Sequence, residues 1–95
     1  MADAIRRVER EVTIPNPQGL HARPVLRFVE IASKFASTIR VHKRDNTSVD
    51  GKSPMEMMLL EATQGTPLRI VAEGNDCKEA VDELSQLVNN GFGEK

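Results

Sequence analysis

The side chain best suited to chemistry in this sequence is a histidine at a predicted loop-to-helix boundary. His21 follows the turn residues Pro17 and Gly19, and an apolar pattern of helical spacing begins after it, with Pro24 near its start. The first backbone amides of a helix lack intrahelical acceptors, and the helix dipole favours negative charge there. Arg23 adds a permanent cation whose planar guanidinium binds phosphate or carboxylate oxygens. These residue types indicate a histidine that accepts a phosphoryl group and is stabilised once it carries one.

The segment GLHARP, residues 19–24, resembles the active-site motif of the HPr family, the histidine phosphocarrier proteins of the bacterial phosphotransferase system. Chemistry alone also allows a solvated loop histidine, and the six consecutive matching residues weigh against that alternative. The resemblance implies that His21 takes a phosphoryl group on Nδ1 from phosphorylated enzyme I, which phosphoenolpyruvate charges. It also implies transfer onward to a IIA-type domain, with Arg23 stabilising the phosphate. We therefore expect a phosphocarrier that is a substrate of partner enzymes and not itself an enzyme.

The composition sets the class of protein. With 95 residues, the chain is long enough for a single domain over residues 1–95, and 3% aromatic residues predict an aliphatic and methionine core. The net charge of -1 argues against binding to nucleic acid or a membrane surface. One cysteine allows no internal disulfide, and we find no signal peptide or membrane-spanning run, so we expect a cytoplasmic protein.

Alternation of apolar and polar residues predicts four strands, and helical spacing predicts three helices. The expected strands cover residues 8–14, 37–43, 47–49 and 68–73, and the expected helices cover 22–34, 54–60 and 77–89. Strands with one polar face favour an α+β two-layer, open-faced sandwich, in which helices cover one face of an antiparallel sheet. The resemblance to HPr proteins implies the strand order first, fourth, second, third.

Side chains at the helix ends predict how the helices begin and end. Ser53 and Glu56 match a capping box in which each side chain bonds the other's backbone amide. Asp76 is expected to cap the last helix, Gly91 to form its left-handed end, and residues 92–95 to be a tail.

Ser53 is also a candidate regulatory site. Many HPr proteins carry a serine at the matching position that a dedicated HPr kinase/phosphorylase modifies, so the resemblance implies phosphorylation here. The capping box explains the same serine without any modification, and both roles are compatible because a helix N-terminus tolerates phosphate. Pro54 stands where the family more often has an aliphatic residue, which puts recognition by the kinase in question.

A docking surface for enzyme I and IIA-type partners is implied by the same resemblance. Leu26, Pro54 and Met55 occupy the matching positions of its apolar part. The cations expected to flank it are Arg27, Lys34 and Lys52. The alternative for Met55 is a place in the core, as expected for Met58. Nothing in the sequence demands oligomerisation, and we expect a monomer.

Other chemistry-bearing residues show no further site. We expect His42 to be solvated on the polar face of its strand and Cys77 to be a small buried hydrophobe. Two histidines and one cysteine, widely spaced, give no metal-binding pattern, and no glycine-rich loop indicates a nucleotide. The prediction is a protein that needs no metal or cofactor.

Three alternatives remain open at this point. One is a regulatory carrier of the nitrogen-related branch of the same system, to which residues 52–58 bear some likeness. Another is a non-catalytic module controlled through Ser53, although the presence of both His21 and Arg23 speaks against it. The least favoured is a small enzyme using His21 as a general base, since no second catalytic group accompanies it.

Overall fold

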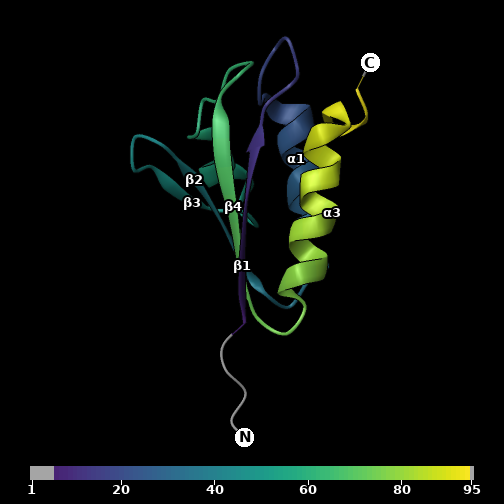
Figure 1. The fold of residues 1–95 in the computed structure, drawn as a ribbon. Helices are drawn as coiled ribbons and strands as arrows, with labels where there is room; N and C mark the ends of the chain where they lie inside the picture. The colour runs from purple at the N-terminus through teal and green to yellow at the C-terminus, as the bar shows by residue number, and fades with distance from the viewer. Residues whose placement is uncertain (1–5, 95) are drawn as a thin grey trace, which may run out of the picture.

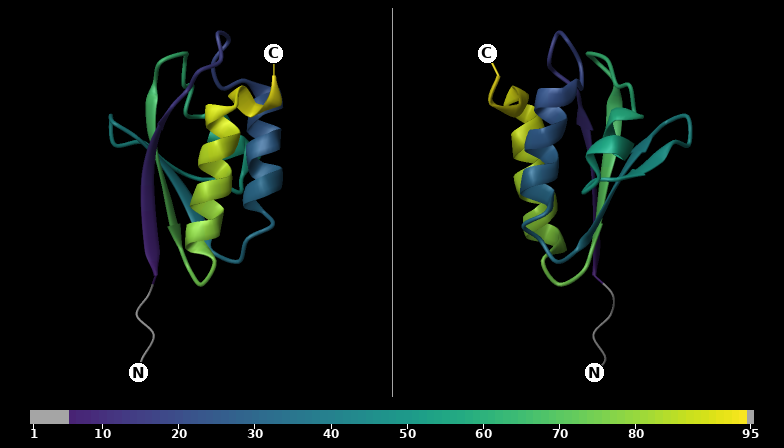
Figure 2. Two further views of the ribbon diagram at one scale, coloured as in Figure 1. Left: turned by 45° about the vertical axis from the view of Figure 1, so that its right-hand side comes forward. Right: turned by 180° about the vertical axis from the view of Figure 1, so that it is seen from behind.

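Four strands form one antiparallel sheet, and helices cover one of its faces. The computed structural model describes residues 6–94. The elements, in chain order, are β1 (Arg7–Thr13), α1 (Ala22–Ala32), β2 (Thr38–Lys43), β3 (Ser48–Asp50), α2 (Pro54–Met58), β4 (Pro67–Glu73), α3 (Cys77–Asn89) and a 3-10 turn, η1 (Gly91–Gly93). The strand order is β1-β4-β2-β3, and α1 and α3 lie side by side on the same side of the sheet (Figures 1 and 2). The predicted fold class and strand order are confirmed.

The alternation along the strands decides which side chains enter the core. Ile39 and Val41 of β2 and Ile70 of β4 face the helices and are almost completely buried. They pack with Phe28 of α1 and Leu84 of α3 in one continuous cluster. Burial of each such side chain contributes about 1.5–3 kcal/mol, so the two-residue period of the strands and the apolar stripes of the helices stabilise the same arrangement.

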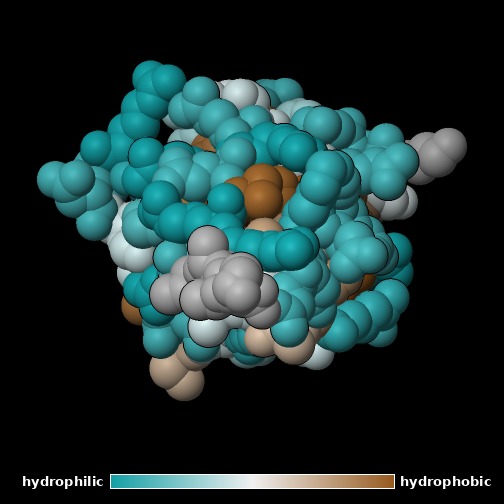
Figure 3. All heavy atoms as spheres, turned by 60° about the horizontal axis from the view of Figure 1, so that its bottom comes forward, coloured by the Kyte–Doolittle hydropathy of each residue, from teal (hydrophilic) through white to brown (hydrophobic). Residues whose placement is uncertain are grey.

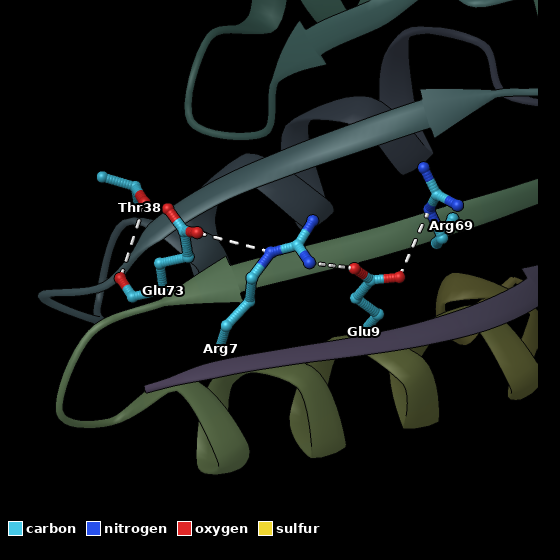
Figure 4. A network of polar contacts seen from close by, with 5 residues as sticks. All are labelled: Arg7, Glu9, Thr38, Arg69 and Glu73. Atoms are coloured by element: carbon cyan, nitrogen blue, oxygen red, sulfur yellow. Dashed lines mark hydrogen bonds and ion pairs between the residues drawn. The ribbon is translucent and has the colours of Figure 1, made fainter. Parts of the chain in front are cut away.

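The opposite face of the sheet carries charged side chains that contact one another. Arg7 contacts both Glu9 and Glu73, and Arg69 Nε lies 3.7 Å from a carboxylate oxygen of Glu9 (Figure 4). Alternation along β4 places Val71 on this face together with Arg69 and Glu73, and yet Val71 is buried. The register places Val71 between Glu9 and Arg40, whose long side chains can cover it with their methylene groups.

His42 lies on this charged face, where we expected a solvated histidine. The side chain is instead half-buried. Burial, together with the positive charges of Arg69 and Arg40, lowers the pKa of His42. The ring is therefore held mainly in its neutral form near neutral pH.

The short helix α2 is capped as predicted by one side chain but not by the other. Ser53 Oγ accepts a hydrogen bond from the Glu56 amide at 3.2 Å. The Glu56 carboxylate does not reach back to Ser53, because it accepts the Asp50 amide at 2.9 Å instead. The capping box is thus only half formed, and Glu56 joins α2 to the end of β3.

Asp76 is the first residue before α3, as predicted, but its carboxylate does not cap the helix. It accepts hydrogen bonds from the Ala36 amide at 2.8 Å and from the Ser37 amide at 2.9 Å, and also from the Ser37 hydroxyl. The sequence predicted correctly that α3 begins after Asp76, but the carboxylate of Asp76 bonds other amides than predicted. These amides belong to the segment between α1 and β2. α1 itself ends at Ala32, two residues before the predicted end.

No helix within residues 6–94 is both long enough and apolar enough to cross a membrane.

We predict that replacing Asp76 by Asn makes the stability of the protein less dependent on acid pH. The hydroxyl of Ser37 first, and then the amides of Ala36 and Ser37, lower the pKa of Asp76 below its ordinary value of 3.8. A lowered folded-state pKa contributes stability above the unfolded-state pKa, and this contribution is lost as the pH falls through the folded-state value. Urea unfolding should therefore show D76N less stable than the wild type near neutral pH, with the difference shrinking below pH 3.8. A difference that stayed constant through this range would contradict the assignment.

Candidate functional site

The loop between β1 and α1 is held against a second loop, and this contact fixes where α1 begins. The Gly19 amide bonds the Asn16 carbonyl at 2.9 Å, which closes a tight turn, and the Leu20 amide bonds the Ala62 carbonyl at 2.8 Å. Leu20 itself is buried in the core. His21 therefore follows directly on an anchored residue, so its position does not depend on a free loop.

His21 is the N-cap residue of α1, as the sequence predicted. Its backbone is extended, and its side chain makes no capping hydrogen bond to the helix. By helix geometry the amides of Ala22 and Arg23 have no intrahelical acceptor, and Pro24 has no amide hydrogen at all. The His21 side chain is 35% exposed, so its ring is accessible to solvent, and the two residues that follow it carry the free donors. This arrangement suits an anion bound at the helix end.

An open hollow surrounds the ring, and two arginines from the first turns of α1 line it. Arg23 and Arg27 contribute the positive charge, and the chain segments around Asn16 and Phe92 form the other walls. Arg23 is 80% exposed, and its guanidinium lies 4.0 Å from a carboxylate oxygen of Glu94. The hollow thus brings together the two predicted site residues, His21 and Arg23, with a cation that the sequence had placed on the docking surface, Arg27.

The residues that sequence reasoning missed come from the other end of the chain. The expected tail instead begins with the turn η1, in which Phe92 is only 2% exposed, and Glu94 follows it into the hollow; Lys95 is outside the described residues. Gly91 has the positive φ of 69° expected of a left-handed helix end. The signal that could have found this turn is an apolar Phe92 between two glycines, which is an unusual composition for a solvated tail.

Glu94 contacts the site directly. Its Oε2 lies 3.4 Å from Nε2 of His21, and its Oε1 accepts a hydrogen bond from the Asn16 side-chain amide at 2.7 Å. The same Asn16 nitrogen donates to the Gly91 carbonyl at 2.9 Å. A carboxylate and an arginine therefore lie together beside the ring.

The family is decided by the sequence around this site. A sequence model described as "PTS HPr component phosphorylation site" matches residues 8–90. The chain belongs to the HPr family. It is therefore a member of the phosphocarrier proteins of the phosphotransferase system, as the GLHARP segment predicted.

Several HPr relatives are similar over most of their length. The phosphocarrier protein HPr of Pseudomonas aeruginosa is 43% identical over 84 residues, which cover 88% of this chain and 93% of that protein. The phosphocarrier protein NPr of Proteus mirabilis is 34% identical, over 90% of this chain and 94% of that protein. The crystal structure of HPr-C-His from Thermoanaerobacter tengcongensis superposes with a TM-score of 0.88 at 45% identity, covering 93% of this chain and 98% of that one.

The candidate regulatory serine of this HPr chain lies at the start of α2. Ser53 is partly exposed, and its hydroxyl is occupied as the cap of the Glu56 amide. The neighbouring Lys52 does not extend freely into solvent, since its ammonium donates to the Phe35 carbonyl at 2.7 Å. The local geometry accounts for Ser53 as a structural residue and leaves its modification a prediction.

Exposed apolar side chains gather on the helices that the docking prediction named. Leu26 of α1 and Met55 of α2 are 57% and 78% exposed. Met58, which we expected in the core, is 43% exposed, and Leu59 beside it is 67% exposed. The core position belongs to Met57, because a helix of only five residues can bury a single narrow side.

One of the predicted flanking cations, Lys34, has an acidic neighbour within the molecule. The ammonium nitrogen of Lys34 lies 4.0 Å from a carboxylate oxygen of Glu83 in α3, so the charge of Lys34 is partly neutralised within the molecule.

Hydrophilic residues cover most of the surface at the end of the molecule opposite the His21 loop (Figure 3). The large apolar side chains that are exposed are Leu26, Met55, Met58 and Leu59. We call them the apolar patch, and they lie on the helices that the docking prediction named.

We predict that replacing Gly19 by Ala destabilises the protein by about 2 kcal/mol or more. Gly19 has a φ of 72°, and a Cβ atom there would lie 2.6 Å from the Ala62 carbonyl oxygen. Gly65 is a matched control, because it has a φ of 87° but no atom within 4 Å of the added Cβ. G65A should cost only the backbone strain, about 1 kcal/mol. Equal losses for the two variants in urea unfolding would show that the contact with residue 62 does not constrain the loop.

Proposed function

We propose that this protein is a phosphoryl carrier that accepts a phosphoryl group on His21 from phosphorylated enzyme I and passes it to a IIA-type domain. The observation that carries the proposal is the partly exposed His21 ring at the N-cap of α1, beside two free amides and Arg23. Phosphoenolpyruvate is the original donor. A carrier of this kind works in the cytoplasm, where phosphoenolpyruvate is made.

The chemistry of the site suits reversible transfer. A neutral imidazole is a good nucleophile near neutral pH, and its phosphoramidate is a labile adduct suited to onward transfer. The amides of Ala22 and Arg23 and the Arg23 guanidinium can hold the phosphoryl oxygens as negative charge shifts between donor and acceptor. An open hollow favours this use, because each partner must approach the ring with its own catalytic groups. We expect this chain itself to need no cofactor or metal ion for the role.

We also infer that the apolar patch is the surface that both partners bind. The patch lies on α1 and α2, and His21 is the residue directly before α1. A partner bound to the patch therefore brings its own catalytic groups close to the His21 ring. Methionine suits this role because its flexible side chain can pack against unrelated surfaces. Arg27, on the same helix and lining the hollow, supplies a cation between the patch and the ring.

The sugar-uptake branch is better supported than the nitrogen-related branch. The relative named HPr is 43% identical and the relative named NPr is 34% identical over similar lengths. Regulation through Ser53 by an HPr kinase remains a prediction, as does the monomeric state.

We predict that replacing His21 by Ala abolishes labelling by enzyme I and phosphoenolpyruvate without unfolding the protein. The His21 side chain makes no capping hydrogen bond, so its removal should change stability by less than about 0.5 kcal/mol. The other histidine provides the control: H42A should be labelled as the wild type is. Acid-labile phosphate can be mapped by mass spectrometry. Labelling of H21A, or loss of labelling in H42A with His21 intact, would overturn the proposal.

A charge in the apolar patch should weaken docking and leave the His21 site intact. We predict that M55E raises the KM of enzyme I for this protein about tenfold or more, since burying an unpaired carboxylate in an apolar interface is costly. The substitution should not alter stability, because Met55 is 78% exposed. Q86E, on the exposed side of α3, is the control and should behave as the wild type. An unchanged KM for M55E would remove this surface from the proposal.

A further inference from the structure

The carboxylate of Glu94 is held in place by the side chain of Asn16, which lies far from it in the sequence. Asn16 is 5% exposed, and its side-chain nitrogen donates to Glu94 Oε1 at 2.7 Å and to the Gly91 carbonyl at 2.9 Å. Both partners are acceptors, so the nitrogen of the amide must face them and the amide cannot be turned over. The Asn16 oxygen is buried without a hydrogen-bond partner among the described residues, which shows that these two bonds alone fix the orientation.

The turn before Glu94 adds a second restraint. Phe92 has a φ of 60°, a left-handed conformation that is costly for a non-glycine residue, and it is 2% exposed. Burial of this ring in the core offsets the cost of the conformation. Glu94 then follows through a hydrogen bond from its amide to the Gly91 carbonyl at 3.0 Å. Only 19% of its side chain is exposed, so solvent competes weakly for the carboxylate.

The second oxygen of Glu94 faces the histidine. Oε2 lies 3.4 Å from Nε2 of His21, which is longer than a well-formed hydrogen bond, and contacts of this kind tighten when a partner or substrate arrives. An ionised carboxylate only accepts hydrogen bonds, so its negative charge at this distance favours the tautomer that carries the proton on the nitrogen facing it, Nε2. A neutral imidazole has one N–H, and Nδ1 is then left with a free lone pair.

We propose that Glu94, held by Asn16, is a positioning residue that keeps the proton of His21 on Nε2 and thereby makes Nδ1 the nucleophile. The inference rests on the proposed function in taking His21 as the phosphoryl acceptor. In the step itself, the Nδ1 lone pair forms a bond to phosphorus while the bond from phosphorus to the donor's leaving group breaks with its electron pair. The ring gains a positive charge, and its Nε2–H lies against the negative charge of Glu94.

The chain of donors and acceptors predicts an unusual result for a conservative change. In E94Q, one of the two carboxylate oxygens becomes an NH2 group. The Asn16 nitrogen can only donate, so the remaining side-chain oxygen at position 94 must stay with Asn16, and the new NH2 group faces the ring. His21 Nε2 must then accept, which moves the ring proton to Nδ1 and removes the nucleophile. E94Q should therefore be more harmful than E94A, which leaves the ring without a preference from this side.

Two measurements that need no partner protein test the proposal. Nitrogen-15 NMR at about pH 8, where imidazole is neutral, gives the tautomer of each histidine. Phosphoramidate then serves as a small phosphoryl donor: attack by a ring nitrogen forms N–P, ammonia leaves, and the first adduct is assigned to Nδ1 or Nε2. His42 is an internal reference, and E79Q, on the exposed surface of α3, matches the charge change of E94Q.

We expect the proton on Nε2 and an early Nδ1 adduct in the wild type and in E79Q. E94Q should carry the proton on Nδ1, and its ratio of Nδ1 to Nε2 adduct should fall about tenfold, as expected when a favourable polar contact of Nε2–H with residue 94 becomes unfavourable. E94A should fall between these. Unchanged tautomers and adduct ratios in E94Q and E94A, or a wild-type proton on Nδ1, would overturn the proposal.

The proposed function can fail separately. If enzyme I does not label the wild type while the tautomers shift as expected, the carrier role is wrong and the role of Glu94 stands. If enzyme I labels His21 and the tautomers do not respond to residue 94, the carrier role stands and the positioning role is wrong.

Discussion

One side-chain amide joins the two ends of the described chain. Asn16 lies in the loop after β1. Its two hydrogen bonds reach Gly91 and Glu94, which lie 75 and 78 positions further along the chain. Because the amide is buried, these bonds are protected from competition with water. They place the turn after α3 against the loop that leads into α1. Residues 91–94 therefore form one wall of the hollow around His21. Without this wall, the ring would lie at an open helix end.

Much of the fold was predictable because it depends on local periodicity. The strand faces followed from alternation, since a residue such as Ile39 or Ile70 enters the core wherever the two-residue period places it. The strand order did not follow from periodicity. It came from the GLHARP resemblance, because pairing between β1 and β4 is a choice among several antiparallel sheets that the same pattern allows.

The errors share a physical cause, which is competition between partners that are close in space and distant in sequence. Asp76 and Glu56 match capping patterns, yet each carboxylate bonds amides outside its own helix. Met58 and Val71 differ from expectation because burial depends on what covers a position, here the shortness of α2 and the stems of neighbouring charged residues. Glu94 was missed for the same reason: nothing in residues 92–94 alone shows that the Asn16 amide lies within hydrogen-bond distance of them.

The open setting of His21 has a consequence for how long a loaded protein would last. The ring is 35% exposed, and the hollow has no lid among the residues described. If the ring is phosphorylated as we propose, water can reach it as well as a protein acceptor can, and spontaneous hydrolysis would then limit the lifetime of the phosphoryl group. Such a carrier would have to transfer its phosphoryl group soon after receiving it. It could serve only those acceptors that it reaches by diffusion within that lifetime.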